Sequence, residues 1–293
     1  MFSYRHAFHA GNHGDVLKHT ILVQILDYLK RKDTPFWVID THAGAGLYAL
    51  DGPWARQSGE AAAGVARLRT RPNPPVLVQR YLQALQAFSD PPGRDTLYPG
   101  SPALAVRALR AHDHLHLFEW HPTEIDVLHQ TLERLDADPR RVGIRHADGF
   151  AGLAALLPPP PRRGLILIDP SYEDKNDYRK VLNAVRAGLQ RFAQGCYMIW
   201  YPLVQRVQAT EMARALERLP VNWLHATLRV RKPSADGLGL HGSGVFVINP
   251  PYTLHGELRT ALPWLAQTLA QDAQAGYALR SGTAPQKRSP GRK

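Results

Sequence analysis

The sequence predicts an α/β protein built on one mostly parallel sheet, and three observations support this. Short apolar segments with strand character alternate with segments of helical spacing along most of the 293 residues. Four successive strand candidates end in a glycine loop or a carboxylate, the place where open α/β sheets bind ligands. The last two strand candidates are joined by a glycine-rich link too short for a full helix. That link predicts an antiparallel hairpin at one edge of the sheet.

The expected strands are five apolar segments followed by the terminal pair. They lie at 36–40, 115–119, 142–146, 164–168 and 196–200, and then at 223–230 and 244–249. Helical spacing marks most of the intervals, at 15–31, 122–135, 149–157 and 177–192. We expect Asp15 to cap the first of these helices. Ser101, followed by Pro102, is expected to cap another that ends near residue 111.

Residues 52–99 interrupt this alternation. Between Gly46 and Ser101 there is no convincing strand, and helical patterns near 60–70 and 77–88 are flanked by proline-rich turns. We therefore predict a small helical insertion in a domain formed by 1–51 and 100–275. Six arginines outnumber three acids in the insertion, which suits contact with a phosphate backbone. A solvated helical appendage explains the same composition equally well.

The charge balance favours a polyanionic partner. Thirty-six Lys and Arg against 25 Asp and Glu give a net charge of +11, and the resulting field attracts nucleic acids. A basic protein with no nucleic-acid role remains the alternative. Residues 276–293 form a basic segment that is expected to be a disordered tail. Its removal leaves roughly half of the excess charge on the folded body.

Other features of the composition exclude several classes of protein. Cys196 is the single cysteine, so an intrachain disulfide and a multi-cysteine zinc site are excluded; it is expected to be inert core. No apolar run reaches the roughly 18–20 residues that span a bilayer, and the first residues lack a signal-peptide core. We expect a cytoplasmic protein with no membrane partner.

The strand ends carry the residues that suggest chemistry. Asp40 ends the first strand, and glycines at 44 and 46 follow it, which allows the backbone to approach a ligand closely. The spacing is not that of a dinucleotide-binding loop, and a plain strand-to-helix turn is the alternative. Glu119 ends the next strand and suits the two hydroxyls of a ribose. Asp148 follows the third and is able to accept a hydrogen bond from an adenine amino group.

The fourth strand runs into Asp169-Pro170-Ser171-Tyr172, and at this point the sequence resembles a known family. A tetrad of the Asp-Pro-Pro-Tyr type after a strand is the mark of amino-group methyltransferases that use S-adenosylmethionine. The segments that narrow the resemblance to the RlmJ family are SYRHAFHAGNHGDVLKH at 3–19, DTHAGAG at 40–46, YPGSP at 98–102 and NPP at 249–251. The resemblance extends to about residue 268.

This resemblance implies a fold, a reaction and a partner. The fold is a Rossmann-like class I methyltransferase sheet, with the N-terminal motif of residues 1–19 folding over the active site. The reaction is methylation of N6 of an adenine in 23S ribosomal RNA, adenine 2030 in that molecule. The enzyme is expected to act as a monomer without a metal ion.

The resemblance also implies roles for individual residues. A cofactor pocket is expected around the residues His19, His42, Gly44, Ser101, Glu119, Asp148, Gly149 and Asp169. The catalytic face is expected to hold Tyr4, His6, Lys18, Asp169, Pro170 and Tyr172. Tyr4 is expected near the substrate base.

The chemistry of the tetrad agrees with that reading. The amino nitrogen of adenine is a poor nucleophile because its lone pair is delocalised into the ring. Asp169 is able to accept one of its hydrogens and the Pro170 carbonyl the other, which aims the lone pair at a methyl sulfonium. Tyr172 is expected to stack on the base. Ser171 replaces the commoner proline and loosens the turn without removing a main-chain acceptor.

Three other interpretations remain open. His6, His9, His13 and His19 suggest a metal site, but their spacing places only some of them on a common helical face, and no cysteine assists. The same tetrad would serve an adenine-N6 DNA methyltransferase. Ser171 is the one feature that supports a non-catalytic, basic RNA-binding assembly factor. Trp200 is expected either to shape the substrate cleft or to pack in the core.

Overall fold

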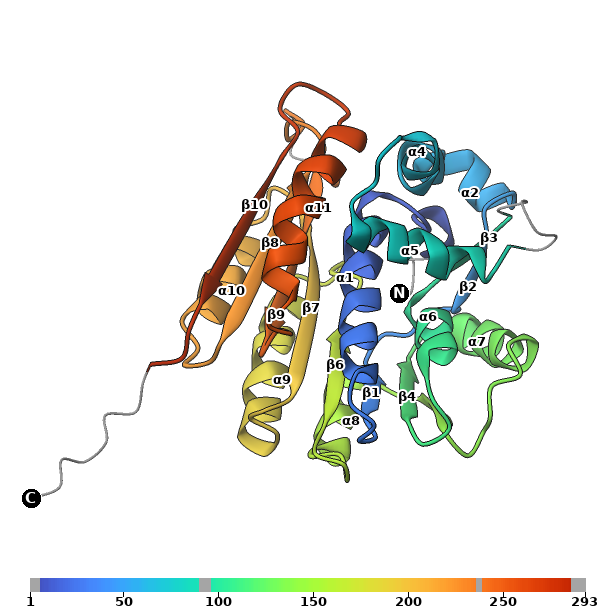
Figure 1. Ribbon diagram of the computed structural model, residues 1–293, viewed down its shortest axis with the longest axis vertical. Helices are drawn as coiled ribbons and strands as arrows, with labels where there is room; N and C mark the ends of the chain where they lie inside the picture. The colour runs from blue at the N-terminus through green and yellow to red at the C-terminus, as the bar shows by residue number, and fades with distance from the viewer. Residues whose placement is uncertain (1–5, 90–95, 236–238, 286–293) are drawn as a thin grey trace, which may run out of the picture.

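The computed structural model describes residues 6–89, 96–235 and 239–285, and it has a central sheet of eight strands (Figure 1). The strand order is β10-β8-β9-β7-β6-β1-β4-β5. The strands of the sheet in chain order are β1 (Trp37–Asp40), β4 (His114–Glu119), β5 (Val142–His146), β6 (Gly164–Ile168), β7 (Cys196–Leu203), β8 (Trp223–Arg229), β9 (Gly242–Ile248) and β10 (Gly276–Gly282). Tyr4 and residues 286–293 of the expected tail lie outside the described residues.

Five strands form the parallel part of the sheet, as predicted. β1 lies between β4 and β6, β5 pairs with β4, and β7 pairs with β6. β5 and β6 span the predicted residues, whereas β7 continues three residues further, to Leu203. The core strand β6 is buried at all five positions, which explains its uninterrupted apolar sequence. All five strands point their carboxyl ends to the same edge of the sheet.

The antiparallel part differs from the predicted edge hairpin. β8 and β9 do pair with each other, but β9 lies between β7 and β8 and is antiparallel to both. The edge strand is β10, which pairs with β8 from Gly276↔Arg229 to Gly282↔Trp223. The prediction of a disordered tail from residue 276 was therefore wrong for residues 276–282. These residues are mostly exposed and carry little apolar signal, so their pairing with β8 is what holds them in a strand.

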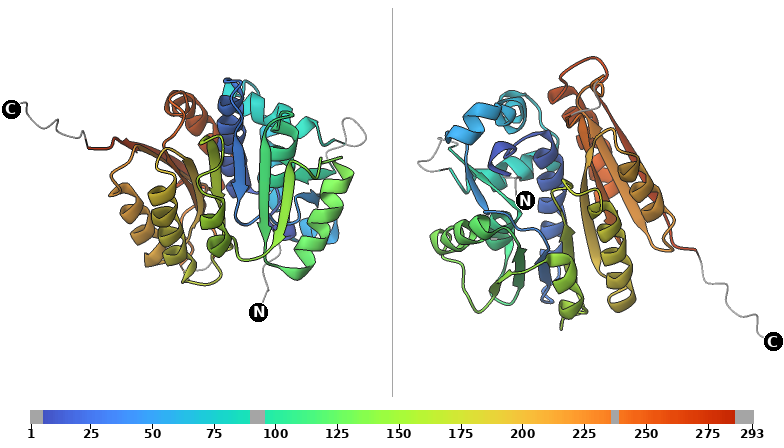
Figure 2. Two further views of the ribbon diagram at one scale, coloured as in Figure 1. Left: turned by 90° about the horizontal axis from the view of Figure 1, so that it is seen from below. Right: turned by 180° about the vertical axis from the view of Figure 1, so that it is seen from behind.

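Helices cover both faces of the sheet (Figure 2). The bounds of the larger helices are α1 (His13–Lys30), α6 (Ser101–Ala108), α7 (Pro122–Arg134), α8 (Gly149–Leu153), α9 (Asp177–Arg191), α10 (Val207–Glu217) and α11 (Leu254–Thr268). The alternation of side chains along β6 divides the core: Leu165 and Leu167 join the cluster with α1 and α11, whereas Ile166 and Ile168 join the cluster with α9 and α10. A short 3-10 helix, Ala154–Leu156, follows α8 and completes the helical segment predicted at 149–157.

α1 is buried along most of its length because it lies between the sheet and further helices. It packs against β6, β7 and β9 on one side, and against α5 (Val76–Gln86) and α11 on the other. Its cap is Asn12, whose side chain accepts hydrogen bonds from the backbone N–H groups of Gly14 and Asp15. The prediction that Asp15 caps this helix was wrong, because its carboxylate is buried and bound elsewhere.

The cap predicted for α6 was wrong for a similar reason. Gly100 occupies the N-cap position, and Ser101 is the first helical residue. The Ser101 hydroxyl donates to the Asp40 carboxylate at 2.6 Å instead of capping its own helix. The helix ends at Ala108, three residues before the expected end.

The segment between β1 and α6 is framed by a small second sheet. β2 (Leu47–Ala49) and β3 (Leu97–Pro99) pair antiparallel, so the expectation of no strand between Gly46 and Ser101 was wrong. Each is only three residues long and pairs only with the other, so periodicity gives no signal for them. Between them lie α2 (Pro53–Ser58), α3 (Glu60–Ala63), α4 (Val65–Thr70) and α5.

These helices share the main core and have no separate one. Val65, Leu68 and Tyr81 belong to the cluster that contains α1 and the sheet. Among the residues that the structure describes, no helix is both long enough and apolar enough to cross a membrane.

Candidate functional site

The carboxyl ends of the parallel strands open into a cavity of about 320 Å³. β1, β4, β5 and β6 contribute the segments that follow them, and α1 forms a further wall. The residues expected at the cofactor and catalytic sites that line this cavity are His6, Lys18, His19, His42, Gly44, Ser101, Glu119, Asp148, Gly149, Asp169 and Pro170. The fold therefore gathers residues that lie far apart in the sequence.

Two glycines allow the backbone to line the cavity closely. Gly44 has a left-handed φ of +63°, and a Cβ there would collide with the Tyr48 hydroxyl. Its N–H donates to Glu119 at 2.7 Å, which ties the loop after β1 to the end of β4. A Cβ at Gly149 would collide with the Thr41 carbonyl. Neither position has room for a side chain, so both loops approach each other and the cavity.

Two carboxylates, at the ends of β1 and β4, accept hydrogen bonds from the loops around the cavity. Glu119 accepts from the N–H of Gly44 and, at 2.6 Å, from that of His121, while burial raises its pKa. Asp40 is buried and accepts from Ser101 and from the His42 N–H at 3.2 Å, and burial raises its pKa to about 6. Each oxygen of Glu119 still has a lone pair available for a ligand.

The end of the cavity beside β5 has an aromatic wall. The His42 ring meets the Phe150 ring edge-on, with centroids 4.7 Å apart, and burial lowers the pKa of His42 to about 3. His42 is therefore neutral at physiological pH. Asp148 caps α8 by accepting from the Phe150 N–H at 2.8 Å through one oxygen. Its second oxygen is available at the cavity.

His19 carries a buried nitrogen without a partner. Its Nδ1 is hydrogen-bonded to the Tyr98 hydroxyl at 2.7 Å, and Tyr98 is bonded in turn to the Tyr81 hydroxyl of α5 at 2.9 Å. Its Nε2 has no hydrogen-bond partner among the described residues. Burial lowers the pKa of His19 well below its usual range, so the ring is neutral. An unsatisfied buried nitrogen in the cavity wall points to a polar ligand group.

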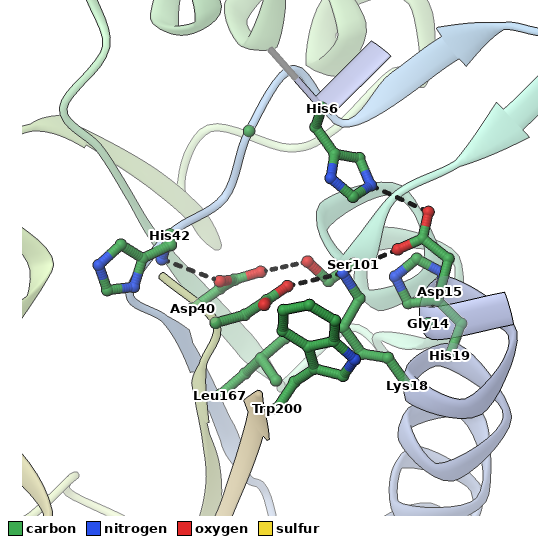
Figure 3. A network of polar contacts seen from close by, with 12 residues as sticks. His6, Gly14, Asp15, Lys18, His19, Asp40, His42, Ser101, Leu167 and Trp200 are labelled. Atoms are coloured by element: carbon green, nitrogen blue, oxygen red, sulfur yellow. Dashed lines mark hydrogen bonds and ion pairs between the residues drawn. The ribbon is translucent and has the colours of Figure 1, made fainter. Parts of the chain in front are cut away.

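A network of buried charges forms the wall beside α1 (Figure 3). Lys18 Nζ lies 2.9 Å from Asp15 Oδ1 and 2.6 Å from Asp169 Oδ2. Asp15 Oδ2 also accepts from His6 Nε2 and from the Gly11 N–H, both at 2.9 Å. Burial alone would raise the pKa of Asp15, but His6 and Lys18 hold it well below its usual range. Burial alone would lower the pKa of Lys18, but the two carboxylates raise it.

This network leaves one face of Asp169 available. Lys18 occupies Oδ2, and Oδ1 has no hydrogen-bond partner in the described parts of the chain. The carbonyl oxygen of Pro170 likewise has no hydrogen-bond partner among the described residues. Two acceptors of adjacent residues thus border the cavity.

Tyr172 does not present a stacking surface, contrary to expectation. Its φ of +55° turns the ring into the core, where it is 2% exposed and packs against Tyr178 at 4.6 Å between centroids. Its hydroxyl donates to the Trp200 carbonyl at 2.7 Å. Ser171, one position earlier, is exposed.

A second cavity, of about 210 Å³, adjoins the first. The residues that line both are His6, Lys18, Asp169, Ser171 and Glu173. The second cavity is lined in addition by Trp200, whose ring also contacts Lys18 at 5.6 Å, and by Arg206. Of the two roles left open for Trp200, this position favours the cleft.

Sequence reasoning missed three residues of this region. Asp15 was interpreted as a cap, Arg206 was not considered, and Asp40 was treated only as the end of a strand. The pairing of Asp15 with Lys18 at helical i,i+3 spacing was the available signal for the first. No signal in the sequence links Arg206 to Tyr172, whose carbonyl it binds.

Two of the four histidines considered for a metal site bind carboxylates instead. His6 is paired with Asp15, and His9 lies 3.1 Å from Glu60. Within residues 6–89, 96–235 and 239–285, no group of three His, Cys, Asp or Glu side chains is arranged to hold a metal ion.

The chain is similar to characterised families of proteins along most of its length. Residues 33–281 match the family described as "Ribosomal RNA large subunit methyltransferase D, RlmJ". A relative from Escherichia coli, "Ribosomal RNA large subunit methyltransferase J", is 42% identical over 286 residues, which cover 98% of this chain and 100% of the relative. A protein of the same name from Haemophilus influenzae is 38% identical over 279 residues, covering 95% of this chain and 98% of that protein.

A solved structure agrees with the fold. The crystal structure of protein LPL1258 from Legionella pneumophila superposes with a TM-score of 0.84 at 34% identity, covering 94% of this chain and 98% of that one. The mostly parallel sheet with helices on both faces is a Rossmann-like class I methyltransferase fold, as predicted. Given the extent of the match and the identity of the relatives, the chain belongs to the RlmJ family of ribosomal RNA large subunit methyltransferases.

Proposed function

We propose that this protein methylates N6 of a specific adenine in 23S ribosomal RNA, with adenine 2030 as the candidate nucleotide. The observation that carries the proposal is the position of Asp169 in the wall shared by two adjoining cavities. One cavity has the features of a cofactor site, and the other has room for a flat ring. The names of the curated relatives support ribosomal RNA as the substrate. We expect the enzyme to act as a monomer in the cytoplasm.

S-adenosylmethionine is the cofactor, and it supplies a methyl group on a sulfonium that a weak nucleophile is able to attack. The residues of the first cavity fit it. Gly44 and Gly149 let their loops pack closely against Tyr48 and Thr41 in the cavity wall, and Glu119 has lone pairs for ribose hydroxyls. Asp148 is able to accept from the adenine amine, while the unpartnered His19 Nε2 suits a polar group of the amino-acid portion.

Asp169 and Pro170 prepare the amine for attack. Asp169 Oδ1 accepts one hydrogen of the target amino group and the Pro170 carbonyl accepts the other. Both bonds fix the plane of the base and raise electron density on the nitrogen, so the catalytic gain comes from positioning and electrostatics. Ser171 does not disturb this arrangement, because neither acceptor belongs to it.

Lys18 anchors the acceptor. Its ammonium holds Asp169 Oδ2, so that Oδ1 faces the substrate. Because Asp15 and Asp169 raise its pKa, Lys18 stays protonated and does not remove a proton from the methylated nitrogen. Asp15 fixes Lys18 and His6 together and is therefore the positioning residue of this wall.

Trp200, in place of Tyr172, offers the aromatic surface for the base. Both residues border the second cavity, but Tyr172 is 2% exposed, whereas Trp200 is only half-buried and its ring centroid lies 5.6 Å from the Lys18 Nζ. An extruded adenine that enters this cavity would contact that ring.

Mass-spectrometric mapping of methylated adenines tests the proposal. Unmodified 23S ribosomal RNA is incubated with the protein and S-adenosylmethionine, and duplex DNA is assayed beside it. We expect one N6-methyladenine in the RNA and none in the DNA. Asp169→Ala should lower the rate by roughly 1,000-fold, because it removes the acceptor that acts in the transition state. Methylation of DNA alone, or full activity of Asp169→Ala, would contradict the proposal.

A further inference from the structure

Two arginines beside the second cavity have no carboxylate partner among the described residues. They are Arg206, which precedes α10, and Arg231, which follows β8. Other half-buried arginines are of two kinds: Arg80 and Arg110 pair with carboxylates, at 3.0 Å from Glu257 and 2.8 Å from Asp113, whereas Arg67 binds a main-chain carbonyl away from either cavity. A guanidinium that is partly removed from water without a counter-charge is costly, so an unpaired one beside a cavity points to an anionic ligand.

Arg206 lines the second cavity directly. It is half-buried, and its Nη1 donates to the carbonyl oxygen of Tyr172 at 2.6 Å. That bond ties the guanidinium to the loop that carries Asp169. It uses one nitrogen and a neutral acceptor, and the positive charge stays uncompensated.

Arg231 reaches the same rim through Leu240, which lines the cavity. Its Nη2 donates to the Leu240 carbonyl at 3.2 Å, and its Nε is buried without a partner. The neighbouring His241 and His13 each have a buried Nδ1 without a partner. Burial lowers the pKa of His13 to about 4, and the charge of Arg231 acts in the same direction. Carboxylates do lie in this region, Glu60 near His13 and Asp272 near Arg231, but none forms an ion pair with Arg206 or Arg231 among the described residues.

The geometry of substrate entry identifies the anion. We propose that Arg206 and Arg231 bind phosphodiester groups of the RNA strand on either side of the nucleotide whose base enters the second cavity. This inference rests on the proposed function. When a base is turned into a cavity, its phosphates remain at the mouth; Arg206 lines this cavity, and Arg231 is bonded to Leu240, which lines it as well. Planar guanidinium forks match phosphate oxygens better than ammonium groups do.

The salt dependence of RNA binding tests this site. The dissociation constant for in vitro transcribed 23S ribosomal RNA is measured over a series of salt concentrations for the wild type, Arg206→Gln and Arg231→Gln. Each substitution should reduce the slope of log affinity against log salt by about 0.7–0.9, the value for one lost phosphate contact. KM for RNA should rise about tenfold while kcat changes less than about twofold, because a phosphate contact is retained from ground state to transition state.

Two further variants serve as controls. Arg191→Gln removes the same charge at the end of α9, at the opposite edge of the sheet, and should leave the slope and KM unchanged. Arg206→Lys keeps the charge and should keep the slope, which separates loss of a phosphate contact from disturbance of the Tyr172 loop. Melting temperature is measured for every variant.

Equal slopes and equal KM values for the wild type, Arg206→Gln and Arg231→Gln would overturn the phosphate site. So would an equal loss in Arg191→Gln, since the effect would then reflect net charge alone. Failure of the proposed function looks different: the wild type itself would leave ribosomal adenines unmethylated, whatever the binding slopes of the variants.

Discussion

The two cavities of this molecule are assembled in different ways. The first lies where four neighbouring parallel strands end, and three of the carboxylates that line it stand at or just after a strand end: Glu119, Asp148 and Asp169. The second is bordered by a helix near the N-terminus, by the end of β7 and by the link between β8 and β9. Its wall depends on ion pairs between distant segments, such as Lys18 and Asp169, which are 151 residues apart. The order of the parallel strands therefore places the residues of the first cavity, whereas ion pairs between buried side chains hold together the wall of the second.

Replacing Asp15, which lines the second cavity and not the first, should impair catalysis more than cofactor binding. We expect Asp15→Asn to lower kcat about 100-fold, because Lys18 and His6 lose the group that fixes them and a small misplacement is costly. The dissociation constant for S-adenosylmethionine, measured by calorimetry, should stay within about threefold. Asp27→Asn is the matched control, because Asp27 and Lys30 form an i,i+3 pair in the same helix with both side chains 35% exposed.

A double-mutant cycle distinguishes positioning from a purely structural effect. If Asp15 acts through Lys18, Asp15→Asn should cost little further activity in a Lys18→Met background. Additive losses in the double variant would show that Asp15 acts independently of Lys18.

Asp40 should make the stability of the folded protein depend on pH. Burial raises its pKa to about 6, above the ordinary value for an aspartate, so the folded state holds this proton more tightly than the unfolded state does. The stabilising contribution is complete below about pH 4 and is lost as the pH rises through about 6, at most about 3 kcal/mol. Denaturant unfolding of the wild type and Asp40→Asn between pH 4 and 7 should show the difference between them changing over that window. A pH-independent difference would refute the assignment.

Glu119 should affect cofactor binding more than catalysis. The backbone N–H groups of Gly44 and His121 now donate to the two oxygens of the carboxylate. A glutamine at position 119 would set its amide NH₂ against one of these two donors. We expect the dissociation constant for S-adenosylmethionine to rise about tenfold, with kcat at saturation within about threefold. Glu133→Gln, on the exposed face of α7, should change neither value. A fall in kcat without a change in affinity would place Glu119 in the chemistry instead.

Ser171→Pro should have the smallest effect, although it lies between the two cavities. Ser171 is exposed, its N–H has no partner among the described residues, and its side chain makes only a long contact of 3.5 Å with the Glu173 N–H. We expect kcat and both affinities to stay within about twofold, since proline removes no used donor. A tenfold loss in a steady-state assay would mean that the loop has a backbone geometry proline is unable to adopt.

The contrast between the cavities also explains what the sequence could predict. β6 was identified because a strand buried at every position reads as a continuous apolar run, and β4 because its apolar residues alternate with histidines; with these strands came Asp169 and Glu119 of the first cavity. β2, β3 and β10 were missed because short or exposed strands depend on their partners for stability. Local patterns suggested that Asp15 and Ser101 were caps, but in the structure Asp15 pairs with Lys18 and Ser101 donates to Asp40.

The orientation of Tyr172 lay beyond sequence reasoning for another reason. A tyrosine after Asp-Pro-Ser is compatible with a stacking role, but one left-handed backbone angle reverses the direction of the ring. Such an angle is uncommon outside glycine and asparagine, so composition gives no warning of it.

The burial of α1 on both sides has a consequence for biosynthesis. This helix leaves the ribosome more than 200 residues before β9 and α11, which cover it. Its apolar surface therefore stays without its native neighbours through most of translation, a situation in which chaperones commonly bind nascent chains. Contacts of such long sequence separation also slow folding. Because α1 carries Asp15 and Lys18, we expect the charged wall of the second cavity to reach its final position only once β9 and α11 have packed against this helix.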